Sequence, residues 1–80
     1  MKQVKHWIYV RGLAEQGNLC DSLDRKLNNA GFKFTGAGSD GRQWDISVEA
    51  PDLEKDVVEI VKICEQLGLK HYDLSIQHLD

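Results

Sequence analysis

The sequence predicts a single α+β domain in which strands and helices follow the order β-α-β-β-α-β. Four short segments rich in β-branched and aromatic residues alternate apolar and polar side chains, a pattern typical of strands. Two longer segments repeat apolar residues at helical spacing. A chain of 80 residues has room for only one core, so we expect residues 1–80 to form one domain.

Residues 4–11 have the strongest strand pattern, because β-branched and aromatic residues dominate the segment. Side chains of a strand alternate between its two faces. One face therefore carries Val4, His6, Ile8 and Val10. The other face carries Lys5, Trp7, Tyr9 and Arg11. Large groups on both faces suit a central strand, and the glycines that follow predict a loop over residues 12–17.

Two helices are predicted from apolar stripes and end signals. The first lies between Asn18, a favourable N-cap, and Gly31, whose left-handed conformation would end it. Its stripe consists of Leu19, Leu23 and Leu27, with Cys20 and Ala30 beside them. The second opens at Pro51-Asp52, since proline is tolerated at a helix start, and ends at Gly68. Its stripe consists of Val57, Ile60, Val61, Cys64 and Leu67.

The other strands are predicted from alternation. Residues 32–35 predict a short strand with Phe32 and Phe34 inward, and residues 36–42 a turn-rich connection with the hairpin pair Asp40-Gly41. The inward residues of the next strand, over residues 43–49, are Trp44, Ile46 and Val48. Those of the last strand, over residues 70–78, are Tyr72, Leu74 and Ile76. The outward residues of both are Gln43, Asp45, Ser47, Glu49, His71, Asp73, Ser75 and Gln77.

This order, with right-handed crossovers, predicts the ferredoxin-like fold, a four-stranded antiparallel sheet with two helices on one face. The first and third strands are usually central in this fold, which would place Trp7 and Tyr9 beside Asp45 and Ser47 on the uncovered face. Tryptophan and tyrosine exposed among polar groups suit recognition of a partner. The alternative is that the two rings only cover the sheet, aided by a loop or by the C-terminal tail.

Composition argues against several classes of function. The formal charge of −3 makes the chain acidic, whereas binding nucleic acid through its phosphates requires clustered Lys and Arg. Carboxylates at Asp45 and Glu49 would also repel the phosphates of an RNA laid on the sheet. The sequence contains no apolar run long enough to span a bilayer and no signal peptide, so we expect no membrane association and a cytoplasmic location.

No catalytic or metal-binding group is predicted. His71 and Asp73 would share a strand face as an acid–base pair, but exposed neighbours of this kind are usually a solvated surface. Cys20 and Cys64 are expected to be reduced, small hydrophobic residues, with a disulfide or metal pair as the alternative. His6 is expected to be a core or edge histidine and not a ligand. We therefore expect no enzyme activity, no cofactor and no metal.

Three segments of the chain resemble a known family. They are residues 6–9 (His-Trp-Ile-Tyr), residues 40–44 (Asp-Gly-Arg-Gln-Trp) and residues 64–73 (Cys-Glu-Gln-Leu-Gly-Leu-Lys-His-Tyr-Asp). Together they resemble the regulator of ribonuclease activity B family, small proteins of similar topology whose named member inhibits ribonuclease E by binding it without catalysis. In that family Gly-Trp usually follows Tyr-Asp, where this chain has Leu74 and Ser75. The resemblance implies a regulatory protein that binds a ribonuclease.

The primary functional prediction is a non-enzymatic module that binds and modulates another protein, with inhibition as the expected effect and a ribonuclease as the implied partner. The residues predicted to bind the partner are Trp7, Tyr9, Arg11, Asp45, His71 and Asp73. A homodimer formed through the same face or through strand edges is a competing use. The main alternative is a small-molecule-binding regulatory domain, with its ligand in the loops over residues 12–17 and 36–41. A flat apolar patch around Trp7 would favour the binding module, and a deep pocket beside His71 would favour an enzyme.

Overall fold

The computed structural model describes residues 5–79. In this part of the chain, four strands and two helices follow the predicted order, with one short 3-10 turn before the first helix. The elements are β1 (His6–Leu13), η1 (Ala14–Gln16), α1 (Gly17–Asn29), β2 (Phe34–Ser39), β3 (Gln43–Glu49), α2 (Leu53–Gln66) and β4 (Asp73–His78). Val4, predicted on the inward face of the first strand, lies outside the described residues.

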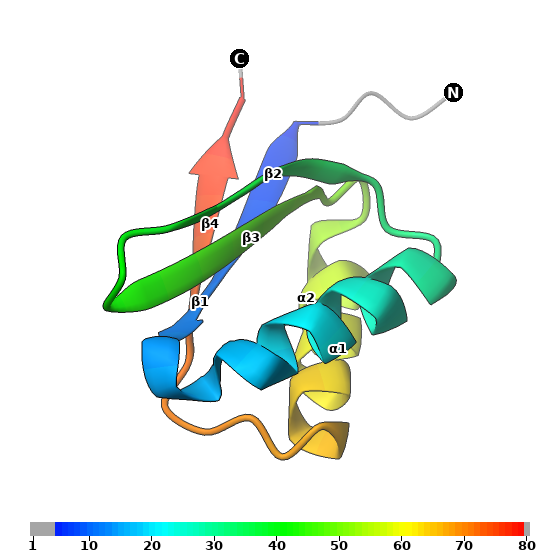
Figure 1. Cartoon of the computed structure of the whole chain (residues 1–80). Coiled ribbons are helices and arrows are strands. Elements are labelled where there is room, and N and C mark those ends of the chain that lie inside the picture. Colours follow the sequence, from blue (N-terminus) through cyan, green and yellow to red (C-terminus); the bar gives the residue numbers. More distant parts are fainter. Residues whose placement is uncertain (1–4, 80) are drawn as a thin grey trace.

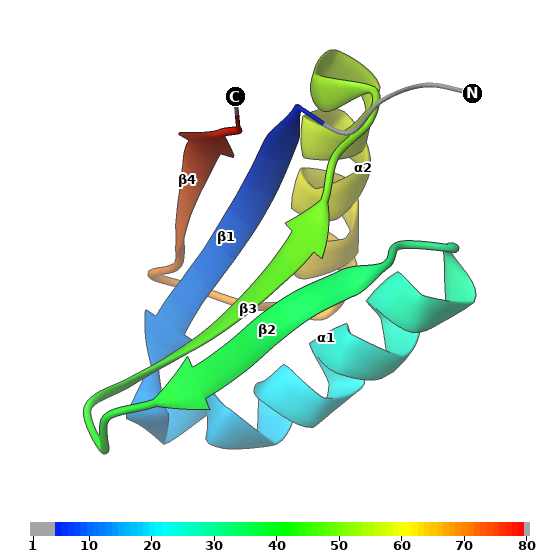
Figure 2. The same ribbon diagram turned by 90° about the horizontal axis from the view of Figure 1, so that it is seen from above.

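The strands form one antiparallel sheet in the order β2-β3-β1-β4, seen side by side in Figure 2. Both helices lie on the same side of this sheet (Figure 1). The predicted ferredoxin-like α+β fold is confirmed, with β1 and β3 as its central strands. One side of the sheet is therefore covered by helices. The other side, which carries Trp7, Tyr9 and Arg11 of β1, is called the open face below.

The core lies between the sheet and the two helices. The residues predicted to point inward from β1 and β3 are buried there, namely Ile8, Val10, Trp44, Ile46 and Val48. Helix α1 contributes Leu23 and Leu27, and α2 contributes Ile60, Ile63 and Cys64. Within α2, Ile63 is buried and Val61 only half-buried, which corrects the predicted stripe. Neither of the helices described in residues 5–79 is long and apolar enough to cross a membrane.

Gly12 lies in β1 directly opposite Trp44 of β3. A Cβ atom at Gly12 would lie only 2.3 Å from Cζ2 of Trp44, so the indole ring packs against the bare backbone of β1. This contact explains why a glycine stands inside the strand, where glycine is otherwise unfavourable. The loop predicted over residues 12–17 is therefore wrong, because this segment is the end of β1, the turn η1 and the first residue of α1.

Both helices end as the sequence predicts. Gly31 and Gly68 follow α1 and α2 with positive φ angles of 91° and 74°. The N–H of Phe32 donates to the carbonyl of Leu27 at 3.1 Å, closing the six-residue hydrogen bond of a Schellman motif. The equivalent bond after α2 runs from Leu69 to Cys64 at 3.0 Å. Each ending therefore turns an apolar residue back against the core.

The start of α1 differs from the prediction. The helix begins at Gly17, and its N-cap residue is Gln16 instead of Asn18. The side chain of Gln16 pairs with the backbone of Lys70, accepting from its N–H at 2.8 Å and donating to its carbonyl oxygen. A residue of the β1–α1 junction thereby fixes the loop between α2 and β4. Sequence spacing could not predict this contact, because the two residues are 54 positions apart.

Strand β2 extends over Phe34–Ser39 instead of residues 32–35. Gly36 and Gly38 predicted a loop, but backbone pairing with β3 holds both in the sheet, with a bulge between Phe34 and Gly36. Phe32 precedes the strand and packs against the core, as Phe34 does. The inward placement of both phenylalanines is thus confirmed, whereas the predicted strand bounds are wrong.

The hairpin between β2 and β3 turns at Asp40 and Gly41, as predicted. The Asp40 carboxylate accepts hydrogen bonds from the N–H groups of Arg42 and Gln43 at 2.9 and 2.8 Å. Gly41 takes a φ of 88°, which favours glycine. Local turn chemistry therefore determines this connection.

Strand β4 begins at Asp73 and not at residue 70. His71 lies in the preceding loop with a φ of 55°, so it does not share a strand face with Asp73. Tyr72 also lies outside the strand and packs against the core. Ile76 stands opposite Ile8 on the helix side but is 43% exposed, because β4 is an edge strand.

Candidate functional site

The open face is organised by β1, which lies between β3 and β4. The strand registers place each outward residue of β1 between one residue of each neighbouring strand. The three rows are Glu49–Trp7–Gln77, Ser47–Tyr9–Ser75 and Asp45–Arg11–Asp73. The structure therefore brings together five of the six residues predicted for the site. His71 is the exception, because it belongs to the loop before β4.

The two aromatic residues occupy adjacent rows of this face. Trp7 and Tyr9 are both half-buried. The Tyr9 hydroxyl donates to Oε1 of Gln77 at 2.8 Å, so Tyr9 is held diagonally toward the row of Trp7. Gln77 is thus both the direct neighbour of Trp7 on β4 and the hydrogen-bond partner of Tyr9. The described part of the chain leaves both rings partly accessible to a partner.

Arg11 lies in a row of alternating charge. It is exposed, and its cross-strand neighbours are Asp45 on β3 and Asp73 on β4. Asp45 is half-buried and Asp73 exposed. One guanidinium between two carboxylates gives this row an excess of one negative charge. A partner that meets this row needs donors opposite the carboxylates and an acceptor opposite the arginine.

Ser47 was predicted to be an outward polar residue, but it is only 3% exposed. Its hydroxyl accepts a hydrogen bond from Thr35 at 2.7 Å and donates to the carbonyl of Gly36 at 3.2 Å. A buried hydroxyl needs such partners to offset its lost hydration. Ser47 therefore fixes the bulged start of β2 against β3, and its role is structural.

Two glycines leave part of the β2 side of the open face without side chains. Gly36 and Gly38 lie opposite Ser47 and Asp45. A Cβ at Gly36 would lie 3.4 Å from the Ser47 hydroxyl oxygen, and one at Gly38 would lie 3.6 Å from a carboxylate oxygen of Asp45. The Asp45 side chain thus extends over bare backbone. This arrangement widens the accessible surface next to the charged row.

A shallow hollow of about 370 Å³ lies at the hairpin end of the charged row. Its walls are formed by Arg11, Ser39, Asp40, Gln43 and Asp45. The backbone N–H groups of Gln43 and Arg42 and, more weakly, the charge of Arg11 lower the pKa of Asp40. The carboxylate is therefore ionised well below neutral pH. This hollow overlaps one of the two loops in which a small ligand was predicted.

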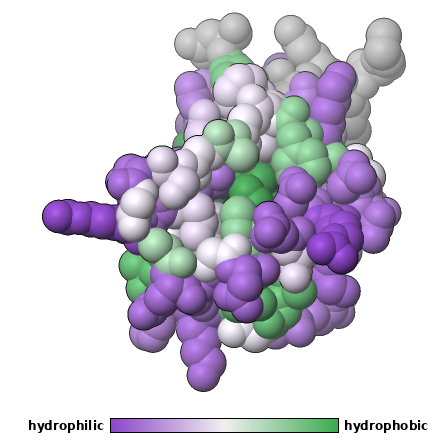
Figure 3. Space-filling model, viewed as in Figure 1, coloured by the Kyte–Doolittle hydropathy of each residue, from purple (hydrophilic) through white to green (hydrophobic). Residues whose placement is uncertain are grey.

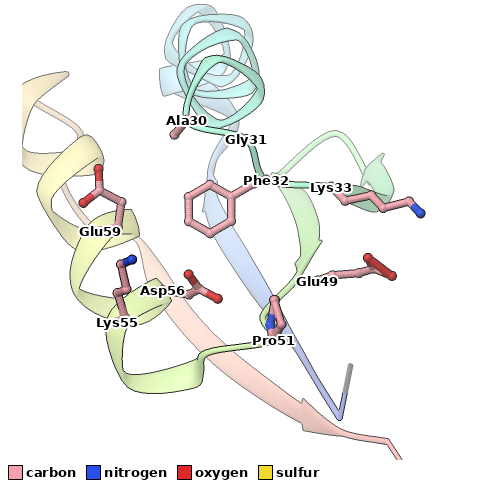
Figure 4. Close-up of a pocket in the computed structure, with 9 residues that line it drawn as sticks. All are labelled: Ala30, Gly31, Phe32, Lys33, Glu49, Pro51, Lys55, Asp56 and Glu59. Carbon is pink, nitrogen blue, oxygen red and sulfur yellow. The ribbon is translucent and has the colours of Figure 1, made fainter. Parts of the chain in front are cut away.

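A second hollow, of about 350 Å³, lies at the other end of the domain (Figure 4). The ring of Phe32 points into it, between the end of α1 and the first turns of α2. Its charged lining consists of Lys33, Glu49, Lys55, Asp56 and Glu59. Asp56 also accepts a hydrogen bond from the N–H of Asp52 at 3.1 Å, which fixes the start of α2. The sequence patterns gave no indication of this hollow, because its walls come from three separate segments.

Large apolar side chains exposed to solvent lie away from the three rows. Val58 of α2 is 61% exposed and Ile76 of β4 is 43% exposed, the latter on the helix side of the sheet. Polar residues dominate the side of the molecule seen in Figure 3, with apolar residues scattered between them. The open face is consequently a mixed surface in which Trp7 and Tyr9 are the large apolar groups of β1.

Both cysteines are free thiols. Cys64 is buried in the core, and burial, followed by the charge of Glu65, raises its pKa to about 11. Cys20 is half-buried; burial, followed by the charges of nearby aspartates, raises its pKa. Cys64 is therefore the predicted buried, small hydrophobic residue, and Cys20 packs against the core from its edge. In residues 5–79, no three His, Cys, Asp or Glu side chains are grouped to hold a metal ion.

The two thiols are expected to react at different rates. A pKa of about 11, against an ordinary 9.0, leaves Cys64 with roughly 100-fold less reactive thiolate near neutral pH. In native protein at pH 8, we expect a disulfide reagent such as DTNB to modify Cys20 first and Cys64 only after unfolding. The variant Cys20→Ala isolates the second rate. Equal rates for Cys64 in buffer and in denaturant would contradict its burial.

Comparisons with known proteins identify the fold but no family. The sequence matches no protein-family profile and no curated protein. The structure is similar to part of the aspartate kinase of Clostridium acetobutylicum, described as an allosteric enzyme, with a TM-score of 0.68 and 15% sequence identity. The match covers 91% of this chain and 18% of the kinase chain. At this identity, the similarity establishes a shared fold.

Proposed function

We propose that this chain is a non-enzymatic regulatory module that binds a protein partner through its open face. The observation that carries the proposal is the placement of Trp7 and Tyr9 on central strand β1, half-buried, on the side of the sheet opposite α1 and α2. Tryptophan and tyrosine are the residues most enriched at the energetic centres of protein interfaces. Their polar neighbours would form the rim of such a contact.

The residues around Trp7 and Tyr9 support a specific contact with the partner protein. Trp7 lies between Glu49 and Gln77. Two rows further along β1, Arg11 lies between two aspartates. Because the charges alternate along this row, a partner with complementary groups is favoured and one with uniform negative charge is repelled. We place Trp7, Tyr9, Arg11, Asp45 and Asp73 in this interface. His71 is at most a peripheral contact, since it lies in the loop before β4.

A ribonuclease is the partner class we test first. Its support is the resemblance of residues 6–9, 40–44 and 64–73 to the regulator of ribonuclease activity B family, whose named member acts by binding. A regulatory role also agrees with the occurrence of this fold within an allosteric enzyme, the C. acetobutylicum aspartate kinase. We propose inhibition as the mode of action, because a partner held by the open face can be blocked without any chemical step.

Replacing Trp7 by alanine is expected to abolish partner binding while leaving the fold intact. The side chain is half-buried on the open face, and truncation of a central interface aromatic commonly costs 2 kcal/mol or more, about 30-fold in affinity. The measurement is an affinity capture from native lysate with wild type and Trp7→Ala in parallel, quantified by mass spectrometry. The captured candidate is then titrated, purified, against both proteins.

Val58→Ala is the matched control for this experiment. Val58 is an exposed apolar residue of α2, on the helix side of the molecule, so its truncation should leave binding unchanged. Circular dichroism and urea titration establish that all three proteins are folded. Loss of the same partner with Val58→Ala, or retention of every partner by folded Trp7→Ala, would reject the open face as the binding surface.

A small-molecule-binding domain is the second candidate function. The observation that favours it is the hollow at the hairpin, whose volume of about 370 Å³ falls within the range of ligand sites. Arg11 and the carboxylates of Asp40 and Asp45 line it, which suits a ligand with both acidic and basic groups. A thermal-shift screen of metabolites distinguishes the candidates. A stabilising ligand whose effect disappears in Arg11→Ala would favour this function over the protein-binding module.

A further inference from the structure

The structure brings two histidines from opposite ends of the chain into contact. His6 of β1 and His78 of β4 are cross-strand partners. Their ring centroids are 4.9 Å apart and the rings meet edge to face at 75°. They share the helix side of the sheet with Ile8 and Ile76 of the next inward row, so the pair is separate from the open face. His78 is exposed and His6 half-buried, which leaves the pair accessible from solvent.

The backbone pairing explains why the two imidazoles are so close. The N–H of Leu79 donates to the carbonyl of Lys5 at 2.7 Å, which makes Lys5 and Leu79 a hydrogen-bonded pair of the ladder. Pairs alternate along antiparallel strands, so His6 and His78 form a non-hydrogen-bonded pair, in which side chains lie closest. The sheet, and not chain flexibility, therefore sets the separation of the rings.

This separation matches the geometry of two histidines on one metal ion. A zinc–nitrogen bond of about 2.0–2.1 Å, plus the radius of the ring, places an imidazole centroid roughly 3.2 Å from the metal. Two such centroids are about 4.5 Å apart at a right-angled coordination and about 5.2 Å apart at a tetrahedral one. The observed 4.9 Å lies between these values, and rotation of the two imidazoles out of their edge-to-face contact aims one nitrogen of each ring at a common ion.

We propose that His6 and His78 form a two-histidine site for a divalent transition-metal ion of the Zn²⁺, Ni²⁺ and Cu²⁺ class. This inference departs from the sequence-based expectation that His6 is not a ligand. Neutral imidazole nitrogen suits these ions, and water completes their coordination. Because the site requires the folded pairing of β1 with β4, the metal binds the native state in preference to the unfolded chain. Binding therefore clamps the edge strand to the centre of the sheet and stabilises the fold.

The test is a titration of the untagged full chain with Zn²⁺, and separately with Ni²⁺, followed by calorimetry and by NMR of the imidazole resonances. Wild type is expected to bind one ion, with the resonances of His6 and His78 shifting together and the melting temperature rising with metal concentration. His78→Gln is expected to weaken binding at least tenfold. His78 is exposed on an edge strand, so this variant should fold normally. His6→Gln should give the same loss.

His71→Asn is the matched control, because it removes the third histidine of the chain and asparagine tolerates the positive φ of that position. Its affinity for Zn²⁺ and Ni²⁺ should equal that of wild type. Binding that persists in the folded His78→Gln variant, or that is lost in His71→Asn, overturns the proposal. Absence of any binding at millimolar metal also overturns it and identifies the pair as a packing contact only.

Discussion

Trp44→Ala is expected to lower the free energy of unfolding by about 3–5 kcal/mol, the usual cost of deleting a buried aromatic side chain. Trp44 is 4% exposed and packs in the core between the sheet and the helices. A domain of this size has little stability to spare, so the variant should be partly unfolded at room temperature. Urea titration followed by circular dichroism measures the loss. A change below about 1 kcal/mol would contradict the position of Trp44 in the core.

Trp44→Phe is the control that separates packing from hydrogen bonding. Among the described residues, the Trp44 indole N–H is buried without a hydrogen-bond partner, and such a donor costs about 1–3 kcal/mol. Phenylalanine removes this donor and keeps most of the apolar contact. We therefore expect a loss of no more than about 1 kcal/mol. Trp44→Phe also leaves Trp7 as the remaining tryptophan, so its fluorescence reports directly on partner binding to the open face.

Gly12→Ala is expected to destabilise the protein by about 1–3 kcal/mol through overpacking. The new Cβ would lie 2.3, 2.6 and 2.9 Å from three carbon atoms of the Trp44 ring. The ring is rigid and buried, so it can avoid the clash only by displacing its neighbours. Gly17→Ala is the matched control, because nothing lies within 4 Å of its added Cβ. Urea midpoints of the two variants give the comparison.

A double-mutant cycle tests whether the cost at Gly12 arises from this one contact. In the presence of Trp44→Ala, the clash disappears and Gly12→Ala should cost close to nothing, so the two effects should be far from additive. Additive losses would mean that Gly12 is required for another reason. The double variant with alanine at both positions starts from low stability. If Trp44→Ala fails to fold, the cycle is best measured with Trp44→Leu.

The candidate site shows how far alternation along a strand can be used. Trp7, Tyr9 and Arg11 were assigned to one face of a strand by parity, and the sheet places them there in three consecutive rows. Asp45 lies beside them because inward and outward side chains also alternate along β3. His71 was misplaced because the strand was extended three residues too early, over a loop that Gln16 fixes through the backbone of Lys70. Parity is reliable inside a strand and fails where a strand ends.

Local chemistry therefore accounts for the order of elements, the apolar sides of β1 and β3, the glycine endings of α1 and α2, and the Asp40 turn. These features depend on neighbours within a few residues, so the sequence pattern predicts them. Long-range contacts account for the rest. Gly12 and Gly36 lie in strands because Trp44 and the pairing with β3 hold them there, against the local preference of glycine. The hollow beside Phe32 and the His6–His78 pair exist only because packing joins segments that are distant along the chain.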